Sequence, residues 1–204
     1  MTGRGRGRPS STEEGAFSAK ILSEALEVLD AEGLEGLTMR ALAARIGINP
    51  MTIHYHFKDR NGLIRALANH VYSEVSPPAK GNARTRVAGL LTAYRAKVVR
   101  HPALTLAIFS RPAVFPEHAK RITADLTKLL GDLGASRERG LLWVHILVDY
   151  THGAALAVAM RGEARRLQSS IDDVDESYER GVAELLDALD QLLLPSQSTG
   201  LVQP

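Results

Sequence analysis

Residues 38–58 read TMRALAARIGINPMTIHYHFK, two short helical patterns that are separated by a turn around Gly47. Thr38 is placed to cap the first helix with its hydroxyl, and Gly47 ends that helix where glycine tolerates a left-handed backbone. Asn49 supplies a second N-cap, and Pro50 follows at the first helical position, where its missing N–H costs little. The spacing predicts a helix-turn-helix, which presents its second helix to a groove of DNA.

The apolar residues give this motif one inner face. They recur at three- and four-residue spacing, which predicts a buried stripe. The residues expected to point inward are Leu42, Ala43, Ile46, Ile48, Ile53 and Phe57. The residues left for the other faces of the second helix are Met51, Thr52, His54, Tyr55 and His56. An aromatic ring and two histidines on an exposed face, with Lys58 after them, suit a phosphate-lined groove.

Positive charge is concentrated around the motif. Residues 36–65 contain one acidic side chain, Asp59, and five basic ones, which are Arg40, Arg45, Lys58, Arg60 and Arg65. The preceding helical segment is acidic and carries Glu24, Glu27, Asp30, Glu32 and Glu35. The formal net charge of the whole chain, +2, conceals this asymmetry. A tight helical hairpin in an all-α protein, without DNA binding, is the alternative interpretation of the same pattern.

The stretch from Ile21 to Val75, which includes ALEVLDAEGLEGLTMRALAARIGINPMTIHYHF, resembles the DNA-binding domain of the tetracycline-repressor family. The resemblance implies an all-α fold: an N-terminal three-helix helix-turn-helix domain, a larger helical ligand-binding and dimerisation core, and a homodimer. It places Arg40 near the start of the second helix, residues 50–56 on the recognition helix and Arg60 at the start of the fourth helix.

With the neighbouring polar residues, the expected DNA-binding set in this domain is Thr38, Arg40, Asn49, Pro50, Met51, Thr52, His54, Tyr55, His56, Lys58 and Arg60. The family usually has tyrosine where His54 stands. A phosphate contact at this position would therefore use an imidazole N–H and depend on pH.

The amino terminus is a second basic segment. It reads MTGRGRGRPSS, with Arg4, Arg6 and Arg8 separated by glycines, and nothing in it can bury apolar area. We expect it to be disordered when free, and it is not a signal peptide because no apolar run follows the arginines. GRGRP resembles the core of an A·T-hook, and arginine on a slim backbone fits the narrow minor groove of A·T-rich DNA. A solvated tail that contributes only charge is the alternative.

The composition favours closely packed helices. Of 204 residues, 45% are hydrophobic and only 5% are aromatic, and no sustained period-two pattern is present. The chain has no cysteine, which excludes disulfides and thiolate catalysis and is compatible with the cytoplasmic location that we expect. No apolar run reaches the roughly 20 residues that span a bilayer, because His145, Asp149 and His152 interrupt residues 141–160.

Helical patterns continue along the rest of the chain. We expect helices at residues 17–32, 61–75, 85–100, 103–110, 116–133, 137–161 and 172–193. The clearest break is SPPAKGN at residues 76–82, since two prolines and a glycine do not continue a helix. The expected domains are a flexible basic arm at 1–16, the helix-turn-helix domain at 17–62, a ligand-binding and dimerisation domain at 63–195 and a loose tail at 196–204.

Two segments near the carboxyl terminus bear on assembly. Residues 141–160 are apolar nearly all round, which predicts a helix that is buried on several sides. The last helix has one apolar stripe, made of Val182, Leu185, Leu186, Leu189, Leu192 and Leu193. Packing these helices against their symmetry mates would form an isologous four-helix interface, and the alternative is an ordinary intramolecular core. Such a dimer predicts a near-palindromic operator with half-sites about 34–36 Å apart, or a multiple of that.

A helical core with a few inward polar groups is a plausible apolar pocket for a small molecule. The candidate ligand-binding residues are Tyr94, Phe109, Arg111, Phe115, Trp143, Val144, His145, Val148 and His152. Within this set Arg111–Pro112 resembles an arginine–proline pair that borders the pocket of the tetracycline repressor. That repressor's metal-binding histidine and glutamate align near Ala107 and Ala157, which counts against tetracycline with magnesium as the ligand.

The strip formed by His145, Asp149 and His152 lies at i, i+4 and i+7 of one helix. Two imidazoles and a carboxylate at that spacing can hold a divalent metal. A hydrogen-bonded structural seam, or polar groups aimed at an organic ligand, are the more common interpretations, and we expect no bound metal.

Enzyme motifs are absent from the sequence: it has no G-x-S-x-G, no G-x-x-x-x-G-K, no H-E-x-x-H and no dinucleotide fingerprint. We therefore expect no catalytic residue and no cofactor. The expected function is a ligand-responsive transcriptional regulator, a repressor by the family's common mode, that binds its operator as a homodimer and is released by a small molecule. The alternative is a constitutive or architectural DNA-binding protein without an effector.

Overall fold

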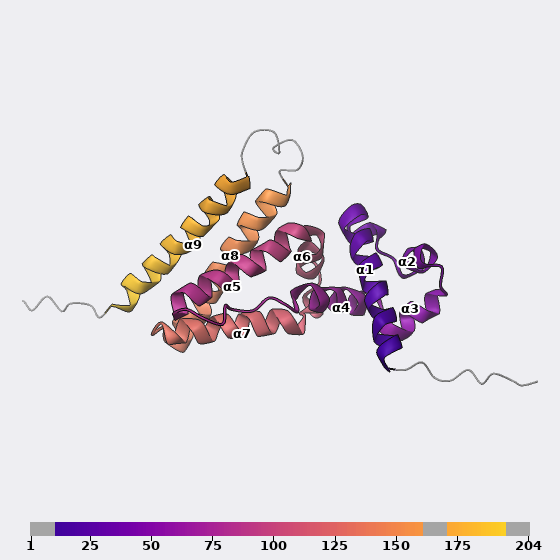
Figure 1. The fold of residues 1–204 in the computed structure, drawn as a ribbon, viewed down its shortest axis with the longest axis horizontal. Helices are drawn as coiled ribbons and strands as arrows, with labels where there is room; N and C mark the ends of the chain where they lie inside the picture. The colour runs from indigo at the N-terminus through magenta and orange to yellow at the C-terminus, as the bar shows by residue number, and fades with distance from the viewer. Residues whose placement is uncertain (1–10, 161–170, 195–204) are drawn as a thin grey trace, which may run out of the picture. The chain divides into compact units, whose positions relative to one another are not determined.

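The computed structural model describes residues 11–160 and 171–194, and within these residues every regular element is a helix (Figure 1). The expected all-α fold is therefore confirmed. The chain's internal contacts divide it into two compact units. The first comprises residues up to Ser73 together with His101–Ala119, and the second comprises Glu74–Arg100 and the residues from Lys120 onward. Each unit is described by itself.

The first unit contains the predicted helix-turn-helix. Its elements are α1 (Ser11–Gly36), α2 (Met39–Ile46), α3 (Pro50–Phe57), α4 (Arg60–Tyr72), α6 (Pro102–Phe109) and the short 3-10 helix η1 (Pro112–Val114). Helix α1 packs against α2, α4 and α6, and α3 packs against α2 and α4. The core between them is aliphatic, and fully buried members include Ile21, Leu29, Leu42, Ile53, Leu63 and Leu67.

Helix α1 is longer than the sequence pattern indicated. It begins at Ser11 rather than Phe17, inside the segment that was expected to be a flexible arm. Glu14 lies near its amino terminus, where negative charge complements the helix dipole, and Ala16 is a strong helix former. The helical backbone is interrupted at Gly33, where φ is 69° and ψ is −170°, so the chain kinks before Gly36.

The boundaries of α2 and α3 follow the predicted local signals. The Thr38 hydroxyl accepts a hydrogen bond from the Ala41 N–H at 3.1 Å, and the Asn49 side-chain oxygen accepts one from the Met51 N–H at 2.8 Å. Gly47 adopts φ 74°, and the N–H groups of Gly47 and Ile48 donate back to the last turn of α2. Both N-caps and the glycine C-cap are therefore confirmed.

The second unit is built on α5 (Ala83–Arg100), α8 (Arg137–Met160), α9 (Ile171–Leu193) and most of α7 (Glu117–Asp132). Helices α5, α8 and α9 pack against one another side by side (Figure 1). The expected helices at 85–100, 116–133, 137–161 and 172–193 thus exist, with ends that differ by a few residues. Residues 161–170 and 195–204, including the predicted carboxyl-terminal tail, lie outside the described residues.

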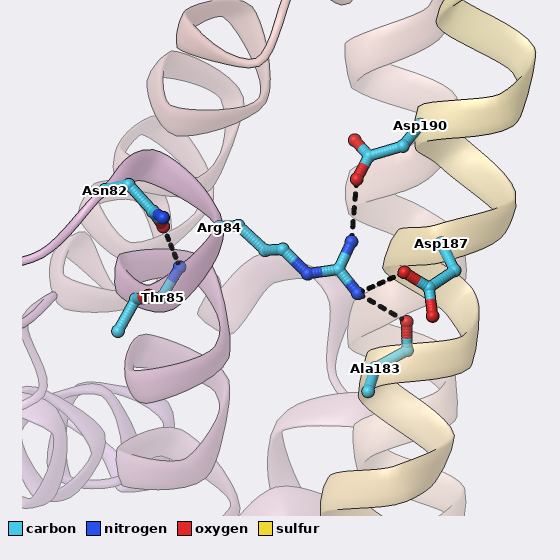
Figure 2. Close-up of polar contacts among 6 residues, drawn as sticks. All are labelled: Asn82, Arg84, Thr85, Ala183, Asp187 and Asp190. Atoms are coloured by element: carbon cyan, nitrogen blue, oxygen red, sulfur yellow. Dashed lines mark hydrogen bonds and ion pairs between the residues drawn. The ribbon is translucent and has the colours of Figure 1, made fainter.

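Arg84, in the first turn of α5, forms hydrogen bonds to residues of α9, as Figure 2 shows. Its two terminal nitrogens contact Asp190 at 2.7 Å and Asp187 at 2.6 Å, and one of them also donates to the Ala183 carbonyl at 2.9 Å. These two aspartates lie outside the apolar stripe of α9, within which Val182, Leu186 and Leu189 are buried. Leu192, which belongs to the same stripe, is 57% exposed.

Helix α8 departs from expectation in its apolar length. Its 24 residues make it long and apolar enough to cross a membrane by length and composition alone. This contradicts the expectation that no apolar run reaches that length, although the core helix of a soluble protein can have the same length and composition. Within the chain α8 is buried mainly along Trp143, Val144, Leu147 and Ala155. Leu141, Leu142 and Met160 of the same helix are exposed in the single chain, whereas the expectation of burial on several sides included packing against a symmetry mate.

Candidate nucleic-acid interface

The outer face of α3 carries large side chains that the fold leaves in solvent. Met51 is 69% exposed and Tyr55 is 74% exposed, although both could contribute to an apolar core. Ile53 and Phe57, on the opposite face, are buried and hold the helix against α2 and α4. Exposed aromatic and thioether groups on a short, capped helix form a surface that can contact bases and sugars in a groove.

The two histidines of α3 differ in their exposure and in their hydrogen-bond partners. The His54 ring is exposed, and its Nδ1 lies 2.9 Å from the carbonyl oxygen of Lys58. The His56 ring is half-buried, its Nδ1 lies 3.2 Å from the Ser18 hydroxyl of α1, and the Phe17 ring lies 5.6 Å away between centroids. His56 therefore ties α3 to α1, a role that sequence reasoning missed because Ser18 is distant in the chain.

The junction between α3 and α4 has a strained backbone at Lys58. Its φ of 66° and ψ of −60° lie close to the rare γ-turn conformation with positive φ, and Lys58 is the sole non-glycine residue with positive φ in the described part of the chain. The Asp59 N–H donates to the Phe57 carbonyl at 2.8 Å across this turn. Asp59 then caps α4 by accepting from the Gly62 N–H at 2.7 Å. No sequence signal indicated this conformation.

The basic residues around the motif are not equally available to DNA. Arg45 bonds to Glu24 at 2.9 Å and to Glu27 at 2.8 Å, and these hydrogen bonds raise its pKa. Arg60 is half-buried and donates to the Leu34 carbonyl, and Arg65 donates to the Ala113 carbonyl at 2.9 Å. Of the five positive charges expected from the sequence, the charge of Arg45 is thus neutralised by the two glutamates of α1.

Arg40 and Lys58 retain exposed side chains, and within the described residues neither forms an ion pair. Thr38 and Asn49 are also exposed, but their side-chain oxygens are occupied by the capping bonds. Thr52 and Pro50 are half-buried. Arg4, Arg6 and Arg8 of the predicted arm lie outside the described residues.

The structure divides the ligand-binding candidates between the two units. Phe109, Arg111 and Phe115 belong to the first unit, and both phenylalanines are 52% exposed. The other six, Tyr94, Trp143, Val144, His145, Val148 and His152, belong to the second unit.

Within the second unit, two of the candidates meet directly. The Tyr94 hydroxyl lies 2.6 Å from His152 Nε2, and their rings are arranged edge to face. Burial lowers the pKa of His152, and the charge of Asp149 opposes this effect. His145 and Asp149 are exposed instead. In the part of the chain that the structure describes, no group of three histidine, aspartate or glutamate side chains is placed to hold a metal ion.

A neighbouring polar cluster was not predicted. Arg95 is buried, its guanidinium bonds to Asp175 at 2.6 Å and it lies over the Tyr178 ring at 4.6 Å from the centroid. The Tyr178 hydroxyl lies 2.9 Å from the Thr151 hydroxyl, and burial raises the pKa of Tyr178 to about 12. Sequence reasoning did not single out Arg95 or Tyr178, because the residues that they contact lie on other helices.

Comparison with known proteins adds to this geometry. The family model "Bacterial regulatory proteins, tetR family" matches residues 21–67, which include α2, α3 and the start of α4. The tetracycline repressor protein class C of Escherichia coli is 28% identical over 203 residues, covering 85% of this chain and 90% of that protein.

Solved structures share this fold over most of the chain. Mycobacterium smegmatis BioQ superposes with a TM-score of 0.74 at 21% identity, over 85% of this chain and 97% of its own. A TetR variant from Acinetobacter baumannii AYE in complex with minocycline superposes with a TM-score of 0.68 at 19% identity, over 87% and 98% of the two chains. With its capped helix-turn-helix, its helical second unit and this match to the family model, the chain belongs to the tetR family of DNA-binding bacterial transcriptional regulators, which are not enzymes.

Proposed function

We propose that this regulator binds a near-palindromic operator as a homodimer, represses transcription and leaves the DNA when a small molecule binds its second unit. The observation that carries the proposal is the outer face of α3, where Met51 and Tyr55 are more than two-thirds exposed on a helix whose other face is buried. A folded protein rarely leaves such side chains in solvent on one short helix without a partner for them.

The proposed DNA contacts follow from the exposure of each side chain. Tyr55 and Met51 would contact base edges and sugars, and Arg40 and Lys58 would contact phosphates because no described ion pair occupies them. Thr38 and Asn49 would support these contacts mainly by fixing the starts of α2 and α3. The neighbouring residues that we also propose to contact DNA are Pro50, Thr52, His56 and Arg60. In the arm, Arg4, Arg6 and Arg8 would contact the minor groove.

The proposal of a homodimer is supported by the exposed leucines of the last two helices. Leu142 of α8 is 56% exposed and Leu192 of α9 is 57% exposed, on two helices that pack against each other within the chain. A second copy would cover them in an isologous four-helix contact. The duplicated α3 helices then require operator half-sites about 34–36 Å apart, or a multiple of that.

The proposal of a small-molecule effector is supported by the contact between Tyr94 and His152 in the second unit, which places polar groups among aromatic ones. The Escherichia coli relative is named for tetracycline, and the Acinetobacter protein was solved with minocycline. Ala107 and Ala157 of this chain supply no metal ligand, so we propose an organic effector that does not require magnesium.

Release would be a shift between two populations of the dimer. A ligand that prefers a conformation with unsuitable half-site spacing removes the protein from DNA. Reversing occupancy from 99:1 to 1:99 needs about 5.5 kcal/mol of preference for that conformation. A cytoplasmic location, where DNA and effector are both accessible, is part of the same proposal.

The test starts from a duplex that the full chain selects from a random-sequence DNA library. Tyr55→Ala should weaken binding to that duplex by roughly 1–3 kcal/mol, because Tyr55 contributes a base contact. Glu14→Ala, exposed on α1, is the matched control and should bind as wild type does. Selected sequences without two-fold symmetry, or wild-type affinity in Tyr55→Ala, would contradict the proposal.

A screen of organic compounds against the protein–duplex complex tests the effector. Mass spectrometry of a small molecule that copurifies with the protein would narrow the screen. Release of the duplex by a compound, lost in Tyr94→Phe or His152→Gln, is the expected result. Binding that no compound alters would favour a constitutive regulator.

A further inference from the structure

We propose that His54 contacts a DNA phosphate only as the imidazolium ion, so that each head of the regulator takes up a proton when it binds DNA. The inference rests on the proposed placement of α3 against DNA. It concerns the ring nitrogens of one side chain and follows from the hydrogen bonds around Lys58.

The first step is the identity of the proton on Nδ1. His54 Nδ1 lies 2.9 Å from the Lys58 carbonyl oxygen. A carbonyl oxygen only accepts hydrogen bonds, so Nδ1 must carry the hydrogen. In the neutral ring only one nitrogen is protonated, and the hydrogen bond made by one nitrogen decides the state of the other. Nε2 of neutral His54 is therefore an acceptor.

The second step is that the turn at Lys58 holds this arrangement in place. The Lys58 N–H donates to the His54 carbonyl at 2.8 Å while the His54 ring donates to the Lys58 carbonyl, so two reciprocal bonds join the residues. The Asp59 N–H bonds to the Phe57 carbonyl at 2.8 Å and closes the strained turn around Lys58. A strained conformation persists only where its surroundings hold it, and here they direct the carbonyl oxygen at the imidazole.

The third step is what the exposed side of the ring can bind. A phosphate oxygen is also an acceptor, so the lone pair on Nε2 of the neutral ring cannot bond to it. Adding a proton converts Nε2 to a donor and gives the ring a positive charge. A charge-assisted hydrogen bond to phosphate then forms without breaking the bond to Lys58. Tyrosine, by contrast, donates its hydroxyl hydrogen at any pH near neutrality.

Several charged residues of the first unit have partners of their own. Within the described residues the His54 ring has no bond to another ionisable side chain. In the same unit Arg45 bonds to two glutamates, Asp59 caps α4 and His56 bonds to Ser18. Apart from tyrosine, the ionisable residues on α2 and α4, which pack against α3, are Arg40, Arg45, Arg60, Arg65 and His70. His56 lies on α3 itself, and Lys58 and Asp59 follow it. Helix α1, which His56 contacts through Ser18, carries Glu14, Lys20, Glu24, Glu27, Asp30, Glu32 and Glu35.

The structural half of the proposal can be tested by NMR on the free protein. Long-range 1H–15N spectra of the histidine rings distinguish the two neutral tautomers. At a pH of about 8 we expect His54 to be protonated at Nδ1. A ring protonated at Nε2 would overturn the proposal whatever the binding data show.

The functional half uses the full chain and the duplex that it selects from a random-sequence library, at about pH 6 and about pH 8. These values bracket the range in which histidine changes its charge. We expect binding to tighten toward pH 6 by about fivefold for each head, or about 25-fold for a dimer, because a hydrogen bond to a charged group forms. The salt dependence should also steepen by about one unit per head.

Variants separate His54 from other sources of pH dependence. His54→Gln, whose amide donates at both pH values, and His54→Tyr should bind with a much smaller pH response. His70→Gln removes an exposed histidine of α4 outside the proposed contacts and should keep the wild-type response. An unchanged pH response in both His54 variants would overturn this inference alone. Failure of the wild type to bind DNA at either pH would instead overturn the proposed function.

Discussion

Lys58 combines a strained backbone with an exposed basic side chain at the end of α3. A residue with a side chain costs about 1–3 kcal/mol in such a backbone conformation, and glycine would avoid much of that cost. The chain nevertheless has lysine at this position, and its side chain is exposed at the end of α3. A strained lysine beside the recognition helix is expected where a phosphate contact outweighs the loss in stability.

Replacing this lysine should separate its two effects. Lys58→Gly removes the strain and should raise the free energy of unfolding by about 1 kcal/mol, measured by urea denaturation. Lys58→Ala keeps the strain and is the matched control, so it should gain no stability. Both variants should bind the selected duplex more weakly, with a salt slope lower by about one for each head. Equal stability of the two variants would argue against strain at this residue.

His152 makes stability depend on pH. Burial lowers the pKa of His152 in the folded state, so the unfolded chain binds its proton more readily. Stability should therefore fall as pH drops below about 6.5, where the unfolded residue takes up its proton, and should stop falling once the folded residue is also protonated. In thermal melts between about pH 7.5 and 5.5, His152→Gln should lose less stability than wild type.

His145→Gln is the control for this experiment, since it removes an exposed histidine from the same helix. It should retain the wild-type loss of stability in acid. A wild-type acid response in His152→Gln would show that the buried contact with Tyr94 does not govern the pH dependence.

At the scale of elements, the close approach of α3 to α4 positions the recognition helix. A Cβ atom built on Gly62 would lie 1.9 Å from the Phe57 carbonyl oxygen, which itself accepts the bond that closes the Lys58 turn. Since the clash is with backbone, no side-chain rotation relieves it. Glycine at this position lets the first turn of α4 begin directly under the end of α3.

The substitution Gly62→Ala should therefore be strongly destabilising. We expect a loss of about 2–3 kcal/mol in urea denaturation, because the backbone of the junction must move. It should also weaken DNA binding, since the movement reaches α3. Gly131→Ala in α7 is the control: its Cβ meets nothing within 4 Å, so the variant should be neutral or more stable by about 0.5–1 kcal/mol. Similar stability of the two variants would contradict the close approach.

At the scale of the whole molecule, the proposed function requires both compact units and the basic arm. The first unit contains the recognition helix, and the second contains most of the exposed apolar surface proposed for pairing. The arm would add contacts that depend on charge and on the width of the minor groove. Its contribution is measurable because charge and groove preference respond to different substitutions.

Deleting residues 1–9 should weaken binding to the selected duplex and lower the salt slope by up to about three for each head of the dimer, close to one for each arginine. Replacing Arg4, Arg6 and Arg8 together by lysine keeps the charge, so it should preserve the salt slope. It should nevertheless reduce any preference for A·T-rich sequence beside the half-sites. If the deletion changes neither affinity nor salt slope, the arm is a solvated tail.

Much of the architecture could be predicted because its signals are local. The caps at Thr38 and Asn49, the left-handed Gly47 and the apolar spacing of α2 and α3 each involve residues a few positions apart. The helices of the second unit were predicted from the same kind of local signal. In the first unit, α1 begins earlier than its apolar pattern indicated. The residues that form these local hydrogen bonds and this apolar spacing lie close together in the sequence. The sequence by itself therefore determined the helical fold and the position of the recognition helix.

The tertiary structure alone decided which of the predicted site residues are available. Arg45 is occupied by Glu24 and Glu27 of α1, and His152 pairs with Tyr94 of α5 rather than completing a strip with His145. The turn at Lys58, which sets the tautomer of His54, also has no signature in the sequence. Charge pairing, burial and ring orientation depend on groups brought together by folding, and no spacing along the chain specifies which group becomes the neighbour.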